Sequence, residues 1–274
     1  MRINLIPLTG RGTRFAEVGY TLPKPLIPVS GKPMIVNVIE HAPPCDQWIF
    51  VVLEEHVRDF HINKLLLQTV PNAKIIIDKN PVGQATTCLL AREFIKDDDE
   101  LFITACDNTC LINEEKYNAL RADPSVDAVI WTWTERDILR EKPQSYGWHE
   151  LEADGKTIKR VSVKVPVSSD PFHDHAVVAT FLFKKAKDFM AAADNMITKG
   201  DRTKNEFYVD TIPNYLNELG KRSVIFDVDL FICWGTPAEF YEYQYMEYVS
   251  RFGGTKLSAE QQRLLTLWKR YFRV

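Results

Sequence analysis

The residues best suited to chemistry form a short glycine-rich turn near the start of the chain. An apolar run ends at Leu8, and residues 9–14 (TGRGTR) follow it. Glycine carries no side chain and tolerates positive φ, so the backbone of such a turn comes close to a ligand. Its successive N–H groups form a concave site for phosphate oxygens, and the two arginines add positive charge. The pattern predicts a binding site for a polyanion such as a nucleoside triphosphate.

A lysine between two prolines follows about ten residues later. Lys24 stands between Pro23 and Pro25, and residues 30–33 (SGKP) lead into another apolar run. The P-loop string G-x-x-x-x-G-K-[ST] is absent, and the dinucleotide-binding G-x-G-x-x-G lacks its third glycine at the required spacing. The turn is therefore a phosphate-binding candidate of a different type.

Residues 6–35 closely resemble the signature of the nucleotidyltransferases that make sugar nucleotides and related activated metabolites. That signature is a G-x-G-T-R loop followed by P-K-P-L-x-P-V-x-G-K-P-M-I, and the resemblance extends over roughly residues 3–237. It implies an enzyme that condenses a nucleoside triphosphate with a phosphorylated acceptor, such as a sugar 1-phosphate, and releases pyrophosphate.

The resemblance also implies roles for the residues of these motifs. Arg14 would hold the β,γ end of the triphosphate, and Lys24 would hold the α-phosphate as charge develops there. The stretch 81–85 (PVGQA) resembles the part of the family that reads the nucleobase. The implied nucleotide-binding residues are Leu8, Thr9, Gly10, Arg11, Gly12, Thr13, Gly83, Gln84 and Ala85.

A magnesium site is expected at Asp107, which comes directly after an apolar strand, where ligands of open parallel sheets bind. Mg²⁺ prefers oxygen ligands, and the resembling family holds it with an aspartate at this strand end. The family's second metal aspartate is replaced by Cys233, and a thiol is a poor ligand for Mg²⁺. Asp229 is the favoured substitute, with Asp227 or a single carboxylate as alternatives. Two histidines near residue 174 lack a third ligand, and a zinc site is not expected.

The second half of the resemblance concerns the acceptor. In the family a glycine lines the acceptor pocket, a lysine binds the acceptor phosphate and a glutamate holds sugar hydroxyls. Val163 stands where the family usually has a glutamate before that lysine. The implied acceptor-binding residues are Asn108, Tyr146, Gly147, Lys164 and Glu206.

Hydrophobic periodicity predicts the fold class. Up to residue 105, strands at 3–8, 48–53, 73–77 and 101–105 alternate with helices at 36–41, 54–68 and 84–95, which is typical of a parallel sheet covered by helices. Beyond residue 126 the pattern is mixed, with strands at 126–134, 146–165 (turning at Asp154-Gly155), 176–183 and 223–232, and helices at 184–196, 205–219 and 257–274. We expect a Rossmann-like, mostly parallel α/β sheet with an antiparallel acceptor-binding portion, of the GT-A-like type.

Composition narrows the class further. The chain has 274 residues, 45% of them hydrophobic, and a net charge of −3, which argues against a general nucleic-acid binder. No apolar run is long enough to span a membrane, and an odd count of five cysteines without C-x-x-C pairs favours a reducing cytoplasm. We expect a nucleotidyltransferase domain at 1–252 and a helical extension at 253–274, with a hinge at 253–255. The aromatic run 240–248 leaves a homo-oligomer open.

Three alternatives remain from the sequence. A cytidylyltransferase could act on a non-sugar phosphate, because the acceptor motifs depart from the family pattern. A GT-A-type glycosyltransferase would use a finished sugar nucleotide and release no pyrophosphate. A non-catalytic nucleotide-binding regulator is suggested by Val163 and Cys233.

Overall fold

The computed structural model describes residues 1–254 and 256–274, which group into two compact units. Unit 1 contains Met1–Gly10, Pro43–Ala105 and Glu114–Asp227. Unit 2 contains Arg11–Ala42, Cys106–Asn113 and Val228–Val274. The C-terminal helix groups with these other segments in unit 2. The predicted boundary between a domain at 1–252 and an extension at 253–274 stays a prediction. The hinge proposed at 253–255 includes Thr255, which lies outside the described residues.

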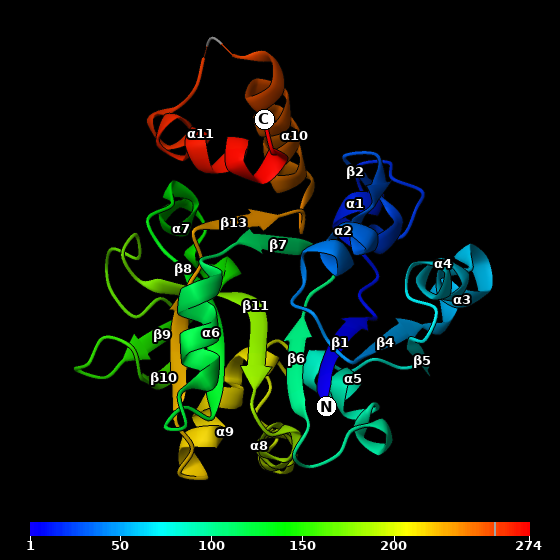
Figure 1. Ribbon diagram of the computed structural model, residues 1–274, viewed down its shortest axis with the longest axis vertical. Coiled ribbons are helices and arrows are strands. Elements are labelled where there is room, and N and C mark those ends of the chain that lie inside the picture. Colours follow the sequence, from blue (N-terminus) through cyan, green and yellow to red (C-terminus); the bar gives the residue numbers. More distant parts are fainter. Residues whose placement is uncertain (255) are drawn as a thin grey trace. The chain divides into compact units, whose positions relative to one another are not determined.

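Unit 1 is built on a mixed sheet, drawn as arrows in Figure 1. Its parallel portion has the strand order β6-β1-β4-β5, and the four strands follow the predicted apolar runs closely. β1, β4 and β6 are buried on both faces along most of their length, as is typical of parallel sheets, whereas β5 at the edge of the sheet is partly exposed. Their bounds are β1 Arg2–Leu8, β4 Gln47–Leu53, β5 Lys74–Asp78 and β6 Glu100–Thr104.

The antiparallel portion begins at β11, which pairs antiparallel with β6, β8 and β9. β9 pairs antiparallel with β10 through the predicted hairpin turn at Asp154-Gly155, and β12 lies parallel to β8. The predicted α/β fold with a parallel and an antiparallel portion is confirmed. The bounds are β8 Ala128–Trp133, β9 Gly147–Leu151, β10 Ile158–Val163, β11 His175–Phe183 and β12 Ser223–Asp227.

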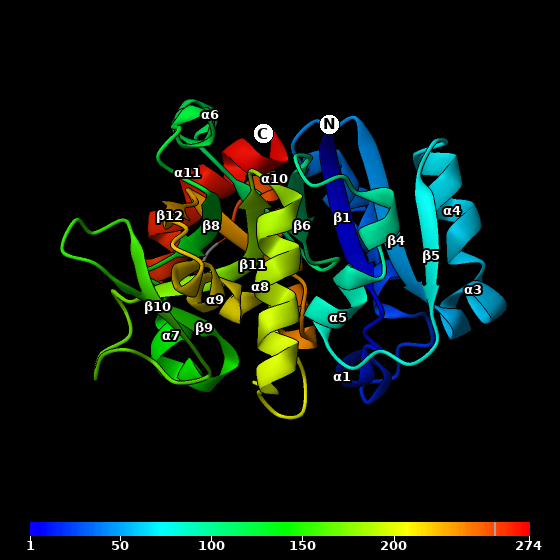
Figure 2. The ribbon, with the colours of Figure 1, turned by 90° about the horizontal axis from the view of Figure 1, so that it is seen from below.

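Helices cover both faces of this sheet, because successive side chains along each strand point to opposite faces and both sets are largely apolar. Tyr117 of α6 packs on one face, with its ring centroid 5.3 Å from that of Trp131 and 5.4 Å from that of Phe226. The neighbouring strand residues point the other way, into a core shared with α5, α8 and α9. These three helices are labelled in Figure 2. These neighbours include Leu101, Ile103, Ile130 and Ile225.

The helices of unit 1 connect these strands. A left-handed residue, His61 (φ 53°), divides the helix predicted at 54–68 into two. The helix predicted at 84–95 is also divided, into α5 and the short 3₁₀ helix η2. The bounds are α3 Glu54–Phe60, α4 Ile62–Thr69, α5 Gln84–Leu89, η2 Arg92–Phe94, α6 Glu114–Ala122, α7 Asp137–Glu141, η3 Pro143–Ser145, α8 Ala186–Lys199, η4 Val209–Thr211 and α9 Ile212–Glu218.

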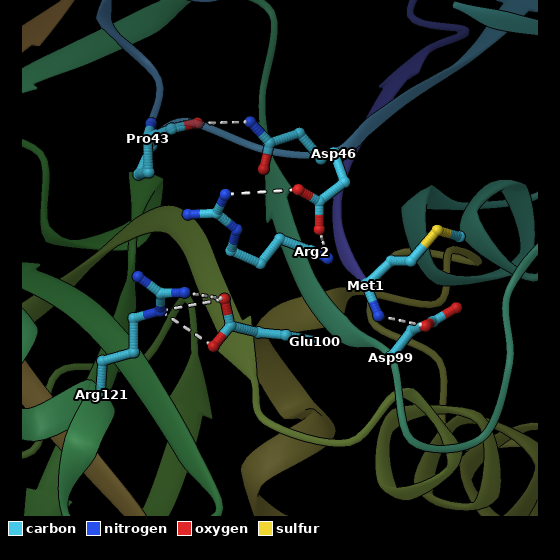
Figure 3. A network of polar contacts seen from close by, with 8 residues as sticks. Met1, Arg2, Pro43, Asp46, Asp99, Glu100 and Arg121 are labelled. Atoms are coloured by element: carbon cyan, nitrogen blue, oxygen red, sulfur yellow. Dashed lines mark hydrogen bonds and ion pairs between the residues drawn. The ribbon is translucent and has the colours of Figure 1, made fainter.

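Polar contacts tie together the ends of the strands at which the parallel portion begins (Figure 3). The amino group of Met1 lies 2.6 Å from Oδ1 of Asp99, and the Arg2 N–H donates to the carboxylate of Asp46 at 2.8 Å. Arg121 of α6 donates to both oxygens of Glu100 at 2.9 Å. These charged groups hold β1 and β6 in place at this edge, which is opposite to the edge where parallel sheets bind ligands.

Unit 2 contains the proline-rich segment and the end of the chain. Its strands form two small antiparallel ribbons, β2 with β3 and β7 with β13. Helix α11 packs on α10 through Trp268 and Phe272 against Tyr243, and it begins with the predicted Ser258–Gln261 capping box. The bounds are α1 Thr13–Ala16, η1 Lys24–Leu26, β2 Pro28–Val29, β3 Lys32–Pro33, α2 Met34–His41, β7 Asn108–Leu111, β13 Leu230–Cys233, α10 Pro237–Phe252 and α11 Ala259–Phe272.

Two sequence predictions of secondary structure were wrong in detail. The strand predicted at 223–232 is two strands, since β12 pairs with β8 in the large sheet whereas β13 pairs with β7 in unit 2. The helix predicted at 205–219 begins only at residue 209, because Thr203 and Glu206 close a tight turn first. Among the described residues, no helix combines the length and the apolar character needed to cross a membrane.

Candidate active site

The predicted lysine and aspartate meet in unit 2. Lys24 begins η1 after the extended Pro23, and its Nζ lies 2.5 Å from Oδ2 of Asp107, in the segment between β6 and β7. Their side chains are only 14% and 17% exposed. Burial alone would lower the pKa of the Lys24 ammonium, but the charge and hydrogen bond of Asp107, together with Cys106 and Cys233, raise that pKa overall. Lys24 is therefore a fixed, fully charged cation at neutral pH.

The glycine-rich turn approaches this lysine closely. A Cβ on Gly12 would lie 3.0 Å from Cβ of Lys24 and 3.4 Å from its backbone nitrogen, and Gly12 has φ 64°. A larger residue here would be strained and would push the turn away from Lys24. Gly10, Arg11, Thr13 and Arg14 are exposed. The turn therefore places two arginines at exposed positions on either side of Gly12.

The turn also passes from one unit to the other, since Leu8, Thr9 and Gly10 belong to unit 1 and Arg11 begins unit 2. On the unit 1 side, Thr9 is held by a buried hydroxyl contact of 3.2 Å to Thr87 of α5. Thr87 donates in turn to the Asp78 carboxylate at 3.0 Å. The contact between Thr9 and Thr87 joins the start of the turn to α5, which includes the end of the predicted base-reading stretch.

Three side chains from different segments converge beside Gly235 in unit 2. A Cβ on Gly235 would lie 3.2 Å from Oδ2 of Asp107, 3.2 Å from Sγ of Cys233 and 3.5 Å from Oε2 of Glu239. Burial, with the nearby carboxylates, raises the pKa of the Cys233 thiol well above its usual value, so the thiol is protonated. The space at Gly235 is therefore bordered by two carboxylate oxygens and a neutral thiol.

Glu239 was missed from the sequence. It lies in the first turn of α10, where its Oε2 accepts from the Thr236 hydroxyl at 2.8 Å and its N–H donates to Oγ1 of Thr236 at 3.3 Å. The Thr-x-x-Glu spacing is a capping-box signal and gives no hint that the carboxylate faces Asp107. Asn108 lies across the β7–β13 ribbon from Cys233, and its buried Oδ1 has no hydrogen-bond partner among the described residues.

The structure does not bring Asp229 to Asp107. In the β7–β13 ribbon Leu230 pairs with Leu111, at the opposite end from Asn108, about 10 Å away at ~3.3 Å per residue. The carboxylate of Asp229 lies 3.5 Å from the guanidinium of Arg270. The two histidines considered for a metal contact different carboxylates. Nδ1 of His175 lies 3.0 Å from Asp227, and Nδ1 of His173 lies 3.8 Å from Glu135.

The predicted base-reading stretch of unit 1 is held by a backbone contact. Gly83 has φ 138°, and a Cβ there would lie 2.4 Å from the nitrogen of Phe207 and 2.8 Å from its oxygen. The N–H of Ala85 donates to the same oxygen at 3.0 Å. Gln84, between them, is half-buried at the start of α5. Only glycine permits this approach of two chain segments.

Four of the predicted acceptor residues, Tyr146, Gly147, Lys164 and Glu206, belong to unit 1, whereas Asn108 belongs to unit 2. The N–H of Lys164, a left-handed residue with φ 66°, donates to the carbonyl of Tyr146 at 2.8 Å, next to Gly147. Nζ of Lys164 lies 5.6 Å from the ring centroid of Tyr208. Glu206 is exposed and closes the turn with Thr203.

Replacing Gly83 tests the backbone contact. Gly83→Ala should lower the free energy of unfolding by about 2 kcal/mol or more, because the new Cβ overlaps rigid backbone as well as requiring an unfavourable φ. Gly155→Ala is the control, since Gly155 has φ 65° but nothing within 4 Å of the added Cβ. Urea unfolding measures both, and equal losses in the two variants would show that the contact with Phe207 imposes no constraint.

Comparison with known proteins places this geometry in a family. The family model described as nucleotidyl transferase matches residues 3–245. The GlmU bifunctional protein of Methanococcus maripaludis (strain C7) is 32% identical over 96 residues, which cover 34% of this chain and 22% of that protein. The chain therefore spans about a fifth of the length of that curated relative.

Solved structures share the fold. A UDP-glucose pyrophosphorylase complexed with UDP-glucose superposes with a TM-score of 0.70 at 18% identity, covering 90% of this chain and 98% of that one. The inositol-1-phosphate CTP transferase of T. maritima has a TM-score of 0.67 at 12% identity, covering 98% and 96%. With a family model that matches most of its length, the chain belongs to the nucleotidyl transferase family of enzymes.

Proposed function

We propose that this enzyme transfers the nucleotidyl group of a nucleoside triphosphate to a phosphorylated small molecule, with a sugar 1-phosphate as the first candidate. A phosphate oxygen of the acceptor forms a bond to the α-phosphorus, and the bond from that phosphorus to the bridging oxygen breaks. Pyrophosphate leaves with the electron pair. The observation that carries the proposal is the fixed, charged Lys24, 2.5 Å from Asp107 and in contact with the glycine-rich turn.

The chain's own groups supply positioning and charge, which is most of what phosphoryl-group chemistry asks of a protein. The N–H groups of the turn, with Arg11 and Arg14, would bind the triphosphate. Lys24 would exchange its contact with Asp107 for an oxygen of the α-phosphate and would stabilise the charge that develops there. Gly83, Gln84 and Ala85 would contact the base.

The magnesium ion that the family implies fits the residues beside Gly235. Two carboxylate oxygens lie within 3.5 Å of one point there, and Mg²⁺ is commonly bound by one or two carboxylates together with substrate phosphates. Asp107 and Glu239 would hold the ion, which would neutralise charge on the triphosphate. Within 1–254 and 256–274, no three His, Cys, Asp or Glu side chains form a metal-binding group, so phosphates and water would supply the other ligands.

A pyrophosphate-release screen tests the activity. ATP, CTP, GTP, UTP and dTTP are each combined with Mg²⁺ and with sugar 1-phosphates, inositol 1-phosphate, glycerol 3-phosphate and phosphoethanolamine. Pyrophosphate release that depends on both substrates is expected for at least one pair. Nucleotide binding without any turnover would identify a regulator instead, and turnover of finished sugar nucleotides without pyrophosphate release would identify a glycosyltransferase.

Lys24→Ala and Asp107→Asn test the catalytic assignment. Each should lower kcat by about 10²–10³, the range found when a group that stabilises transition-state charge is removed. Lys269→Ala, at an exposed lysine on α11, serves as the control and should keep wild-type activity. Circular dichroism shows whether the variants fold. A kcat within threefold of wild type for either Lys24→Ala or Asp107→Asn would contradict the mechanism.

Two positions beside Gly235, Glu239 and Cys233, are tested by measuring the binding of Mn²⁺ alone. The electron paramagnetic resonance signal of the free ion reports how much Mn²⁺ is bound. Glu239→Gln should weaken Mn²⁺ binding about tenfold, and Cys233→Asp should strengthen it about tenfold. Changes to groups around a metal ion typically alter its affinity by at least this factor. The glutamine keeps an oxygen for the cap with Thr236, so the melting temperature should change little. Glu247→Gln, at the Arg251 ion pair of α10, is the matched control. Identical Mn²⁺ binding by Glu239→Gln and the control would remove Glu239 from the site.

A further inference from the structure

A carboxylate to which the sequence analysis gave no role lies among the predicted acceptor residues. Asp210 belongs to η4, and a Cβ on Gly147 would lie 2.8 Å from its Oδ2 and 3.0 Å from Cγ2 of Val177. Any side chain at position 147 would displace this carboxylate. The glycine at the start of β9 therefore makes room for Asp210 against the strand backbone.

Asp210 also faces the predicted phosphate-binding lysine. Lys164 lowers the pKa of Asp210 through its charge, but burial has the larger effect and raises that pKa to about 6. The carboxylate is thus charged at neutral pH although it is half-buried. Retaining a charged carboxylate in such a place costs free energy, which hydrogen bonds from a bound ligand would offset.

Aromatic rings border the same residues. Tyr208 lies two positions before Asp210, and its ring is near Lys164. Tyr146 packs edge-on against Trp133, with ring centroids 5.4 Å apart, and against Trp148 at 6.2 Å. The residues around Gly147 therefore combine a cation, a carboxylate and apolar ring surfaces, which together suit a small molecule with a phosphate at one end and a donor group at the other.

We propose that Asp210 determines acceptor specificity by accepting a hydrogen bond from a hydroxyl or ammonium group of the acceptor, while Lys164 binds the acceptor phosphate. The proposal rests on the function proposed above. An ionised carboxylate only accepts hydrogen bonds, so the group opposite Asp210 must be a donor. Asp210 also supplies a carboxylate near Lys164, where the chain has Val163 in place of the glutamate of the family motif.

The test compares Asp210→Asn, Asp210→Ala and a control, Asp194→Asn, at a surface ion pair with Arg92. Glucose 1-phosphate and inositol 1-phosphate are the hydroxyl probes, and phosphoethanolamine is the ammonium probe. With the nucleotide that supports turnover, both Asp210 variants should raise the acceptor KM about 10- to 100-fold, as expected for a lost charge-assisted hydrogen bond. The KM for nucleotide and both constants of the control should stay within twofold of wild type.

The two variants separate the two donor groups. A hydroxyl can still donate to the amide oxygen of Asp210→Asn, so this variant should be milder than Asp210→Ala. An ammonium loses its counter-charge in both variants, so the two should be equally impaired. Either pattern supports the proposal.

Other outcomes overturn it. An acceptor KM within twofold of wild type in both variants would exclude contact with the acceptor. Parallel rises in both KM values with a lowered melting temperature would show that Asp210 only supports the fold. If the wild-type enzyme releases no pyrophosphate, the proposed function fails separately from the role of Asp210. Calorimetric binding of the same three probes then tests that role alone. Equal affinity in wild type and Asp210→Asn would overturn it, and weaker binding by the variant would uphold it.

Discussion

The contact between the Lys24 ammonium and the Asp107 carboxylate is the interaction on which the rest of the site depends. A cation as sheltered as Lys24 needs a nearby negative group, because removing a charge from water is costly unless a partner compensates. At an effective dielectric constant of 20, two unit charges at close range attract by about 4 kcal/mol. Asp107 provides this attraction in the structure, and in the proposed function a triphosphate with its metal ion would offer each of the two groups a new partner. The site is therefore charged and ordered before its substrate arrives.

Close approach of the backbone is the second constraint, and glycines make it possible. Gly12 lets the turn reach Lys24, and Gly235 leaves space beside Asp107. In unit 1, Gly83 meets the backbone of Phe207 and Gly147 meets the carboxylate of Asp210. Gly12, Gly235 and Gly147 each make room for a group to which the proposals give a role in binding nucleotide, metal or acceptor. Gly83 instead lets the predicted base-reading stretch pack against the backbone of Phe207. In the proposals, Glu239 and Asp210 also replace the acidic groups that Cys233 and Val163 do not supply.

Much of the fold could be predicted from the sequence because local patterns agree with tertiary structure in the first half of the chain. The apolar runs of β1, β4, β5 and β6 and the capping box of α11 are such patterns. The family motif gave Lys24 and Asp107 separate roles at the α-phosphate and the metal ion, and their direct contact was not predicted. Glu239 and Asp210 could not be assigned, because their position depends on which distant segments fold beside them. For the same reason, nothing in residues 223–232 shows that β12 and β13 join different sheets.

The most direct measurement is a crystal structure of the enzyme with Mg²⁺ and a non-hydrolysable analogue of the nucleoside triphosphate that it uses. The account predicts that Nζ of Lys24 leaves Asp107 and lies within hydrogen-bonding distance of an α-phosphate oxygen, while Asp107 binds the metal ion. A bound nucleotide with the contact between Lys24 and Asp107 still intact, and with neither group near the phosphates or the metal, would contradict it.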